Sequence, residues 1–354
     1  MRRIDTGLQS TGTVWVGSAR RGLYTCLAVG LAGVAMACSG GGRPAEPTQT
    51  PAAAAAQAKA PVAGVANTPR YRFAMVTHAP AGDTFWDIIR KGAQTAADKD
   101  NVEFMYTSDG SAPKQAQLIE AAINQKVDGL IVTLAAPDAM EAEVRKAIAA
   151  GIPVTTINAG EDSSAKFGAL DHFGQNEDIA GQAAGEQLNT MGAKNMLCVV
   201  QAQGQVQLEA RCAGAQKTFK GTTDKLYVEG TSMPDVRSKV TASLQTNKSI
   251  DAVLTLGAPI ALTAVQSVKD AASSAKVVTF DMNPELVAAL KAGDVQFAVD
   301  QQPYLQGYLG VDSLWLYKTN GDVLGGGKPV LTGPAIVTRD SVAQIEEFAS
   351  RGTR

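Results

Sequence analysis

From residue 70 onward, the sequence alternates regularly between short apolar runs and longer segments with helical periodicity. The first pair is Tyr71–Thr77, in which six of seven positions are apolar or β-branched, followed by the helical pattern Phe85–Lys99. Such alternation is typical of parallel sheets whose connecting helices cover both faces. In these sheets ligands bind beyond the carboxyl ends of the strands. The sequence therefore predicts an α/β fold with a binding edge that includes residues 77–86.

The remaining runs form two series. Strands are predicted at 102–107, 129–133 and 154–158, and then at 195–201, 225–229, 252–256, 276–280 and 296–299, with a final pair near 330–337. Helices are predicted at 113–126, 137–150, 177–191, 208–219, 236–246, 259–271, 284–291 and 304–318. The irregular stretch 166–174 separates the two series and favours two lobes with one sheet each.

The first 37 residues have the pattern of an export signal. Arg20 and Arg21 precede an apolar stretch, Leu23–Met36, that is too short to span a membrane comfortably as a helix. The segment VAMAC that ends at Cys38 resembles a bacterial lipobox, in which the cysteine becomes the lipidated first residue. The alternative is a plain signal peptide in which Cys38 has no role. Residues 38–69 are rich in Pro, Ala, Gly and Thr and are predicted to be a disordered tether.

Two cysteines remain beyond the signal and the lipidation site. Cys198 lies in a strand pattern, and Cys212 lies in the first turns of the next helical pattern. In an oxidising compartment this pair could form a disulfide, whereas two buried free thiols are the alternative.

The charge balance argues against nucleic acid as a partner. Of 32 basic and 34 acidic residues, the signal contains four Arg and one Asp, which leaves 28 against 33 and a net charge of −5. No basic run interrupts this mildly acidic chain. With two histidines, no H-E-x-x-H motif and no G-x-S-x-G motif, the sequence indicates neither a metal site nor a hydrolase, and no cofactor is implied.

Seven segments, in order, resemble the type I periplasmic solute-binding proteins, the ribose-binding-like sugar-binding subunits of ABC importers. They are GDTFWDIIRKGAQTAA, KVDGLIVT, AGIPVTTIN, GQNEDIAGQAAGEQL, LEARCAG, VVTFD and FAVDQQPYLQGYLGV. The resemblance implies two doubly wound parallel-sheet lobes joined by a three-segment hinge, with the ligand between them. The lobes expected are 70–173 with 302–329, and 174–301 with 330–350. LacI-type regulators share this fold, but they carry a helix-turn-helix where this chain has a signal.

The resemblance also implies a set of ligand-binding residues. On the first lobe, Phe85 and Trp86 would stack on a sugar, and Asp83 would accept protons from hydroxyl groups, although Asp83 could instead cap a helix and Trp86 could belong to the core. The other expected ligand-binding residues all lie at or near predicted strand ends or in LEARCAG: His78, Thr133, Asn158, Arg211, Phe280, Asp281 and Gln301. For Arg211 the alternative is an ion pair with Glu177 or Glu209.

The chain departs from the ribose-binding pattern in two places. Asn158 is followed by Ala159 where Asp-Arg is usual, and Gly257-Ala258 replaces Asn-Asp. These changes count against ribose itself. We expect a lipid-anchored, monomeric, extracytoplasmic receptor that is not an enzyme, captures a monosaccharide or polyol and delivers it to an ABC permease. The alternatives are a nucleoside, cyclic polyol or signalling ligand for uptake or chemoreception and, more remotely, an exported glycosidase that uses Asp83 and Asp281.

Overall fold

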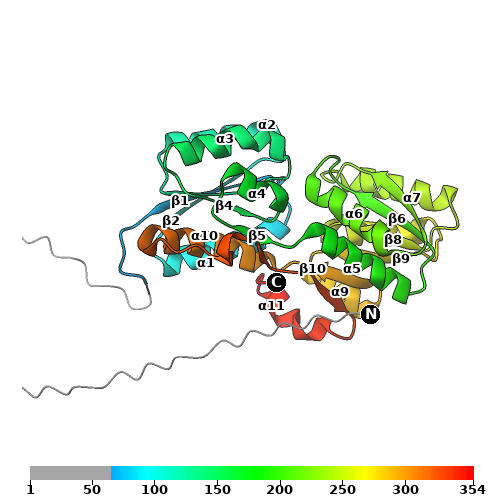
Figure 1. The fold of residues 1–354 in the computed structure, drawn as a ribbon. Coiled ribbons are helices and arrows are strands. Elements are labelled where there is room, and N and C mark those ends of the chain that lie inside the picture. Colours follow the sequence, from blue (N-terminus) through cyan, green and yellow to red (C-terminus); the bar gives the residue numbers. More distant parts are fainter. Residues whose placement is uncertain (1–64) are drawn as a thin grey trace, which may run out of the picture. The chain divides into compact units, whose positions relative to one another are not determined.

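The computed structural model describes residues 65–354, which contain two six-stranded sheets (Figure 1). The first sheet has the order β11-β5-β4-β3-β1-β2, and all of its neighbouring strands are parallel. Its strands are β1 (Arg72–Thr77), β2 (Glu103–Ser108), β3 (Gly129–Val132), β4 (Val154–Ile157), β5 (His172–Gly174) and β11 (Val330–Leu331). The helices that belong with it are α1 (Phe85–Lys99), α2 (Ala112–Asn124), α3 (Pro137–Ala149), α4 (Glu161–Phe167) and α10 (Pro303–Asn320).

The second sheet has the order β12-β10-β9-β8-β6-β7 and is parallel except for the pair of β10 and β12. Its strands are β6 (Asn195–Val200), β7 (Thr222–Tyr227), β8 (Ala252–Thr255), β9 (Lys276–Phe280), β10 (Val295–Asp300) and β12 (Ala335–Thr338). Its helices are α5 (Glu177–Thr190), α6 (Val206–Thr218), α7 (Met233–Thr246), α8 (Ala258–Asp270), α9 (Pro284–Ala292) and α11 (Glu346–Ser350). The 3-10 turns Gly325–Gly327 and Val342–Gln344 complete the described chain.

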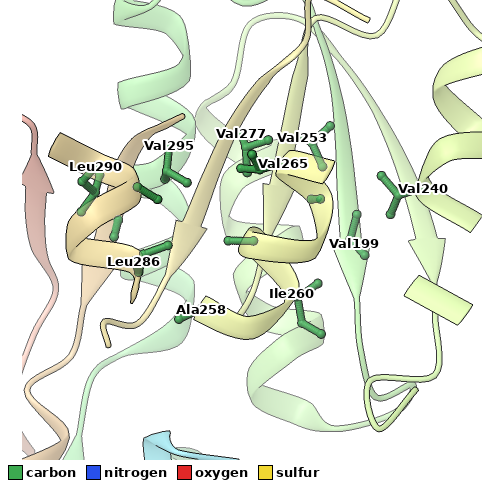
Figure 2. Close-up of a cluster of buried hydrophobic side chains, with 14 of the residues drawn as sticks. Val199, Val240, Val253, Ala258, Ile260, Val265, Val277, Leu286, Leu290 and Val295 are labelled. Carbon is green, nitrogen blue, oxygen red and sulfur yellow. The ribbon is translucent and has the colours of Figure 1, made fainter. Parts of the chain in front are cut away.

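Each sheet is covered by helices on both faces, and strands at its centre, such as β3, β4 and β8, are buried at every position. Successive side chains on a strand point to opposite faces. On β9, Val277 therefore packs with helices α7, α8 and α9, whereas Val278 packs with α5 and α6 on the other face. Figure 2 shows the first of these clusters, in which Val253 and Val277 of the sheet meet Val265 of α8. The predicted α/β fold with two doubly wound lobes is confirmed.

The chain passes between the two sheets at residues 175–176, 301–302 and 332–334. Strand β11 (Val330–Leu331) pairs with β5 in the first sheet, although the sequence analysis assigned residues 330–350 to the second lobe. Only from β12 onward does the chain return to the second sheet. The error arose because a two-residue strand carries too little pattern to show which sheet it joins.

Three local predictions were also inaccurate. Helix α4 and strand β5 were missed, because the segment EDSSAKF is too polar to show a helical stripe and β5 has only three residues. Strand β7 begins three residues earlier than predicted, because its first half is polar and exposed at the sheet edge.

The folded domain begins before Arg70. Ala66 donates a backbone hydrogen bond to the carbonyl of Lys99 at 2.8 Å, and the indole of Trp315 donates to Thr68 Oγ1 at 3.2 Å. The last residues of the predicted tether are therefore part of the first lobe. The predicted signal, Cys38 and the rest of the tether lie outside the described residues. Within residues 65–354, no helix combines the length and the apolar character needed to cross a membrane.

A disulfide joins Cys198 of β6 to Cys212 of α6, with their Cα atoms 6.1 Å apart. Both residues are buried between the second sheet and its helices. The bond fixes α6 to the strand that precedes it, and this helix carries several of the polar residues described below.

Reduction of this disulfide is expected to lower the free energy of unfolding by about 3 kcal/mol, because it removes the cross-link from a loop of about 15 residues. The measurement is unfolding in urea with and without a phosphine reductant. The variant Cys198→Ala/Cys212→Ala is the matched control and should not respond to the reductant. An equal response of both proteins would contradict the prediction.

Candidate functional site

A cavity of about 630 Å³ lies at the carboxyl ends of the strands of both sheets. This volume is in the usual range for small-molecule sites. The loops after β1, β4, β6, β8, β9 and β10 all contribute to its wall. Eight of the ten residues expected to bind a ligand line it: His78, Asp83, Phe85, Trp86, Asn158, Arg211, Asp281 and Gln301.

The first-lobe wall is formed by the loop after β1 and the first turn of α1. Phe85 and Trp86 meet edge to face, with ring centroids 5.3 Å apart, and Trp86 meets the ring of His78 in the same way at 4.8 Å. Asp83 accepts a hydrogen bond from the backbone N–H of Phe85 at 3.1 Å, and burial raises the pKa of its carboxyl. Asp83 therefore accepts from the first N–H of α1, whose N-cap is Thr84, and lines the cavity at the same time.

Thr133 does not line the cavity but holds His78 in place. Its Oγ1 accepts the backbone N–H of His78 at 3.0 Å and lies 2.8 Å from the ring Nδ1. Burial, with the charge of Arg211 as a second cause, lowers the pKa of His78 to about 3. The imidazole is therefore neutral near pH 7, and its other nitrogen, Nε2, lies 3.0 Å from Nε2 of Gln207.

A chain of amide contacts connects the two lobes across the back of the cavity. Asn158 Nδ2 donates to Gln301 Oε1 at 3.0 Å, and Gln301 Nε2 donates to Asp281 Oδ1 at 2.6 Å. Asn158 and Asp281 have φ values of 65° and 67°. Asn and Asp tolerate this left-handed conformation better than most residues, which helps each strand to end in a sharp change of direction. Gln301 lies in the crossing segment between them.

Arg211 is 2% exposed and is held on several sides. Its Nε and Nη2 donate to the two carboxylate oxygens of Glu177 at 2.6 and 2.9 Å, and Nη1 donates to the carbonyl of Leu256 at 3.0 Å. The guanidinium carbon lies 4.7 Å from the centre of the Phe280 ring. Phe280 is itself fully buried in the sheet core and does not line the cavity. Arg211 therefore forms an ion pair with Glu177 and also lines the cavity.

Arg211 lies farther from the carboxylate of Asp281 than from that of Glu177. The distance from Arg211 Nη1 to Asp281 Oδ2 is 3.7 Å, which is longer than a hydrogen bond. Burial raises the pKa of Asp281 to about 7, and the opposing charge of Arg211 does not offset it. The carboxyl is thus balanced between its neutral and ionised forms near neutral pH.

Several wall residues were missed by the sequence analysis. The largest group follows β6 and consists of glutamines: Gln201, Gln205 and Gln207. A signal was available, because the segment QAQGQVQ follows a predicted strand as the other candidates do. Which of these amides is buried depends on the opposite lobe, and that information is absent from the local sequence.

Asp281 is expected to make the unliganded protein less stable as the pH rises. Its folded pKa of about 7 lies above the ordinary value of 3.8, so the folded state retains a proton that the unfolded state releases between these values. Relative to Asp281→Asn, the free energy of unfolding of the wild type should fall by at most about 1.4 kcal/mol per pH unit across this interval. Urea unfolding of both proteins from pH 4 to 8 measures this difference. A difference that does not vary with pH would contradict the pKa assignment.

Comparison with known proteins agrees with this geometry. Residues 73–322 match the model of the periplasmic binding protein domain family. A carbohydrate transporter from Acidothermus cellulolyticus 11B, whose crystal structure is in complex with myo-inositol, is 55% identical, with a TM-score of 0.80. The match covers 81% of this chain and 100% of that one.

Two curated relatives are more distant. The chain is 24% identical over 242 residues to the xylose/arabinose-binding protein of Sulfolobus acidocaldarius, a match that covers 63% of this chain and 60% of that protein. It is 26% identical over 239 residues to the ribose import binding protein of Bacillus subtilis, covering 65% of this chain and 76% of that protein. With two α/β lobes, a cavity between them and a family match over 73–322, this chain belongs to the periplasmic binding protein domain family.

Proposed function

We propose that this protein captures a monosaccharide or cyclic polyol between its two lobes and delivers it to the permease of an ABC importer. The observation that carries the proposal is the composition of the cavity wall, in which an aromatic platform faces carboxylates, amides and one arginine. Carboxylates and amide oxygens accept protons from hydroxyl groups, and amide and guanidinium N–H groups donate to hydroxyl oxygens. A polyol offers both kinds of partner around its whole ring.

Among polyols, myo-inositol is the first ligand to test. It is the ligand in the crystal structure of the Acidothermus protein, which is 55% identical to this chain. Two features of this site support a ligand other than ribose. Ala159 carries no charge next to Asn158, and Gly257 brings no side chain to the cavity.

The proposed mechanism is closure of the hinge around the ligand. Asp83 and Trp86 belong to the first lobe and Arg211 and Asp281 to the second, so a ligand that contacts both walls favours the closed arrangement. Gln301 lies in a crossing segment and already bonds to Asn158 and Asp281. A ligand that binds Gln301 would therefore contact the hinge directly. The permease would then recognise the closed form.

We infer binding without catalysis. The family is one of binding proteins, and Asp83 and Asp281 project from separate lobes that must open and close around the ligand. A glycosidase would need this pair fixed at a defined separation on either side of one bond.

The ligand class is tested by a thermal-shift screen of the purified protein against sugars, inositols, nucleosides and autoinducer-type compounds. A ligand at one hundred times its Kd should raise the free energy of unfolding by about 2.7 kcal/mol. Asp281→Ala should abolish the shift, whereas Asp294→Ala, at an exposed position of the second lobe, should preserve it. If only a nucleoside shifts the melt, the polyol assignment fails. Consumption of a sugar with release of product would overturn the assignment as a non-enzyme.

We also propose that the protein is exported and anchored to the membrane through a lipid on Cys38. Labelling of cells with a radioactive fatty acid should mark the wild type and place it in the membrane fraction. Cys38→Ala should lose both the label and the membrane association, whereas Cys26→Ala, within the predicted signal, should keep them. An unlabelled wild-type protein would rule out lipidation.

A further inference from the structure

The corner between β6 and α6 brings the side chains of Gln201 and Gln207 to the cavity wall. We infer that Gln201 and Gln207 bind hydroxyl groups of the ligand and help to select among polyols. This inference rests on the proposed function, because it assigns two further contacts to the same ligand.

Gln207 is held at one end of its amide and free at the other. The side chain is 4% exposed, and its Nε2 lies 2.9 Å from Gln205 Oε1 and 3.0 Å from His78 Nε2. Its Oε1 is buried and has no hydrogen-bond partner among residues 65–354. A buried carbonyl oxygen without a partner costs about 1–3 kcal/mol, so such an atom in a cavity wall suits a donor from a ligand.

Gln201 presents the same arrangement at the end of β6. Its Nε2 donates to the carbonyl of Leu256 at 3.3 Å, while its buried Oε1 has no partner within the described chain. Like Gln207, it lines the cavity. Two amide oxygens from one corner of the second lobe therefore lack a hydrogen-bond partner within residues 65–354.

The space that Gln201 occupies is left by two glycines. A Cβ atom on Gly257 would lie 3.1 Å from Gln201 Nε2, and one on Gly230 would lie 2.7 Å from Gln201 Cβ. The backbone of Gly257 is extended, with a φ of −172°, so room rather than backbone freedom explains this glycine. The absence of a side chain at 257 thus allows the amide of Gln201 to lie against the cavity wall.

A hydroxyl group fits these positions whichever way each amide is turned. If the carbonyl oxygen faces the ligand, the hydroxyl donates; if the amide nitrogen faces it, the hydroxyl accepts. An apolar substituent can do neither and would leave the amide unpaired. The two glutamines therefore favour ligands that carry hydroxyl groups on this side.

Gln207 also connects the lobes, because His78 belongs to the first lobe. Next to it, the backbone N–H of Val206 donates to the carbonyl of Ala135 at 3.0 Å. The first turn of α6 thus contacts both the cavity and the opposite lobe. A ligand that contacts Gln207 would therefore be bound at the point where the two lobes meet.

The test is isothermal titration of the wild type, Gln201→Leu, Gln207→Leu and Gln216→Leu with myo-inositol and its single-deoxy derivatives. If the screen above returns another sugar, that sugar and its deoxy forms replace them. Leucine keeps most of the volume but has no polar atom. Gln216 is exposed on α6 and provides the same substitution outside the cavity.

Each cavity variant should bind the parent ligand roughly tenfold more weakly, and Gln216→Leu should bind as the wild type does. One deoxy derivative should bind to the wild type roughly tenfold more weakly than the parent ligand does. The leucine variant should bind that derivative with the same affinity as it binds the parent ligand. The hydroxyl missing from that derivative is then the one that the glutamine contacts. Unliganded melting temperatures within a few degrees show that the variants fold. If Gln207→Leu does not fold, Gln201→Leu tests the inference alone.

Two negative results would contradict different claims. If the wild type binds a polyol and both leucine variants bind every derivative as it does, the glutamines do not contact the ligand and the inference is wrong. If the wild type binds no sugar or polyol, the proposed function itself fails, and this inference with it.

Discussion

The site depends on one buried cation. Arg211 lies at the meeting point of α5, α6, β8 and β9, where it bonds to Glu177 and to the carbonyl of Leu256 and lies close to Asp281. A buried guanidinium needs this many partners, because removing one partner of a buried ion pair typically costs about 3–5 kcal/mol. The elements that supply those partners are therefore fixed relative to each other, and the second wall of the cavity is fixed with them.

The same cation is shared unequally by the two neighbouring carboxyls. Glu177 receives two short, parallel hydrogen bonds, a geometry that the planar guanidinium favours. Asp281 is left with one longer contact and with Glu177 as an additional negative neighbour. Burial therefore raises the pKa of Asp281, and the charge of Arg211 offsets this effect only in part. A ligand hydroxyl that donates to Asp281 would favour its ionised form.

The sequence alone was sufficient for the fold and for eight of the residues that line the cavity. Strand–helix alternation predicted the parallel sheets, and the rule that ligands bind at strand ends identified the region of His78, Asn158 and Asp281. Thr133 and Phe280 also end or follow strands, but their side chains turn to a neighbouring loop and to the sheet core. One residue of difference along a strand reverses the face, and strand boundaries are known from sequence only to within a few residues.

The glutamines illustrate what local sequence cannot supply. Gln207 is buried because His78, 129 residues away in the chain, lies against it. Gln201 fits because glycines at 230 and 257 leave it room. Both conditions arise from packing between segments that are distant in sequence. The glutamine-rich segment was visible, but the distinction between solvated and cavity-lining amides required the folded chain.

The contacts of Ala66 and Thr68 determine where the chain enters the domain. Lys99 ends α1, and in a strand–helix–strand unit that end of the helix lies at the amino-terminal edge of the sheet, whereas the cavity lies at the carboxyl edge. The polypeptide therefore joins the first lobe on the side remote from the ligand. If the chain is anchored as proposed, the segment that leads to the anchor would leave the protein from the first lobe, away from the cavity.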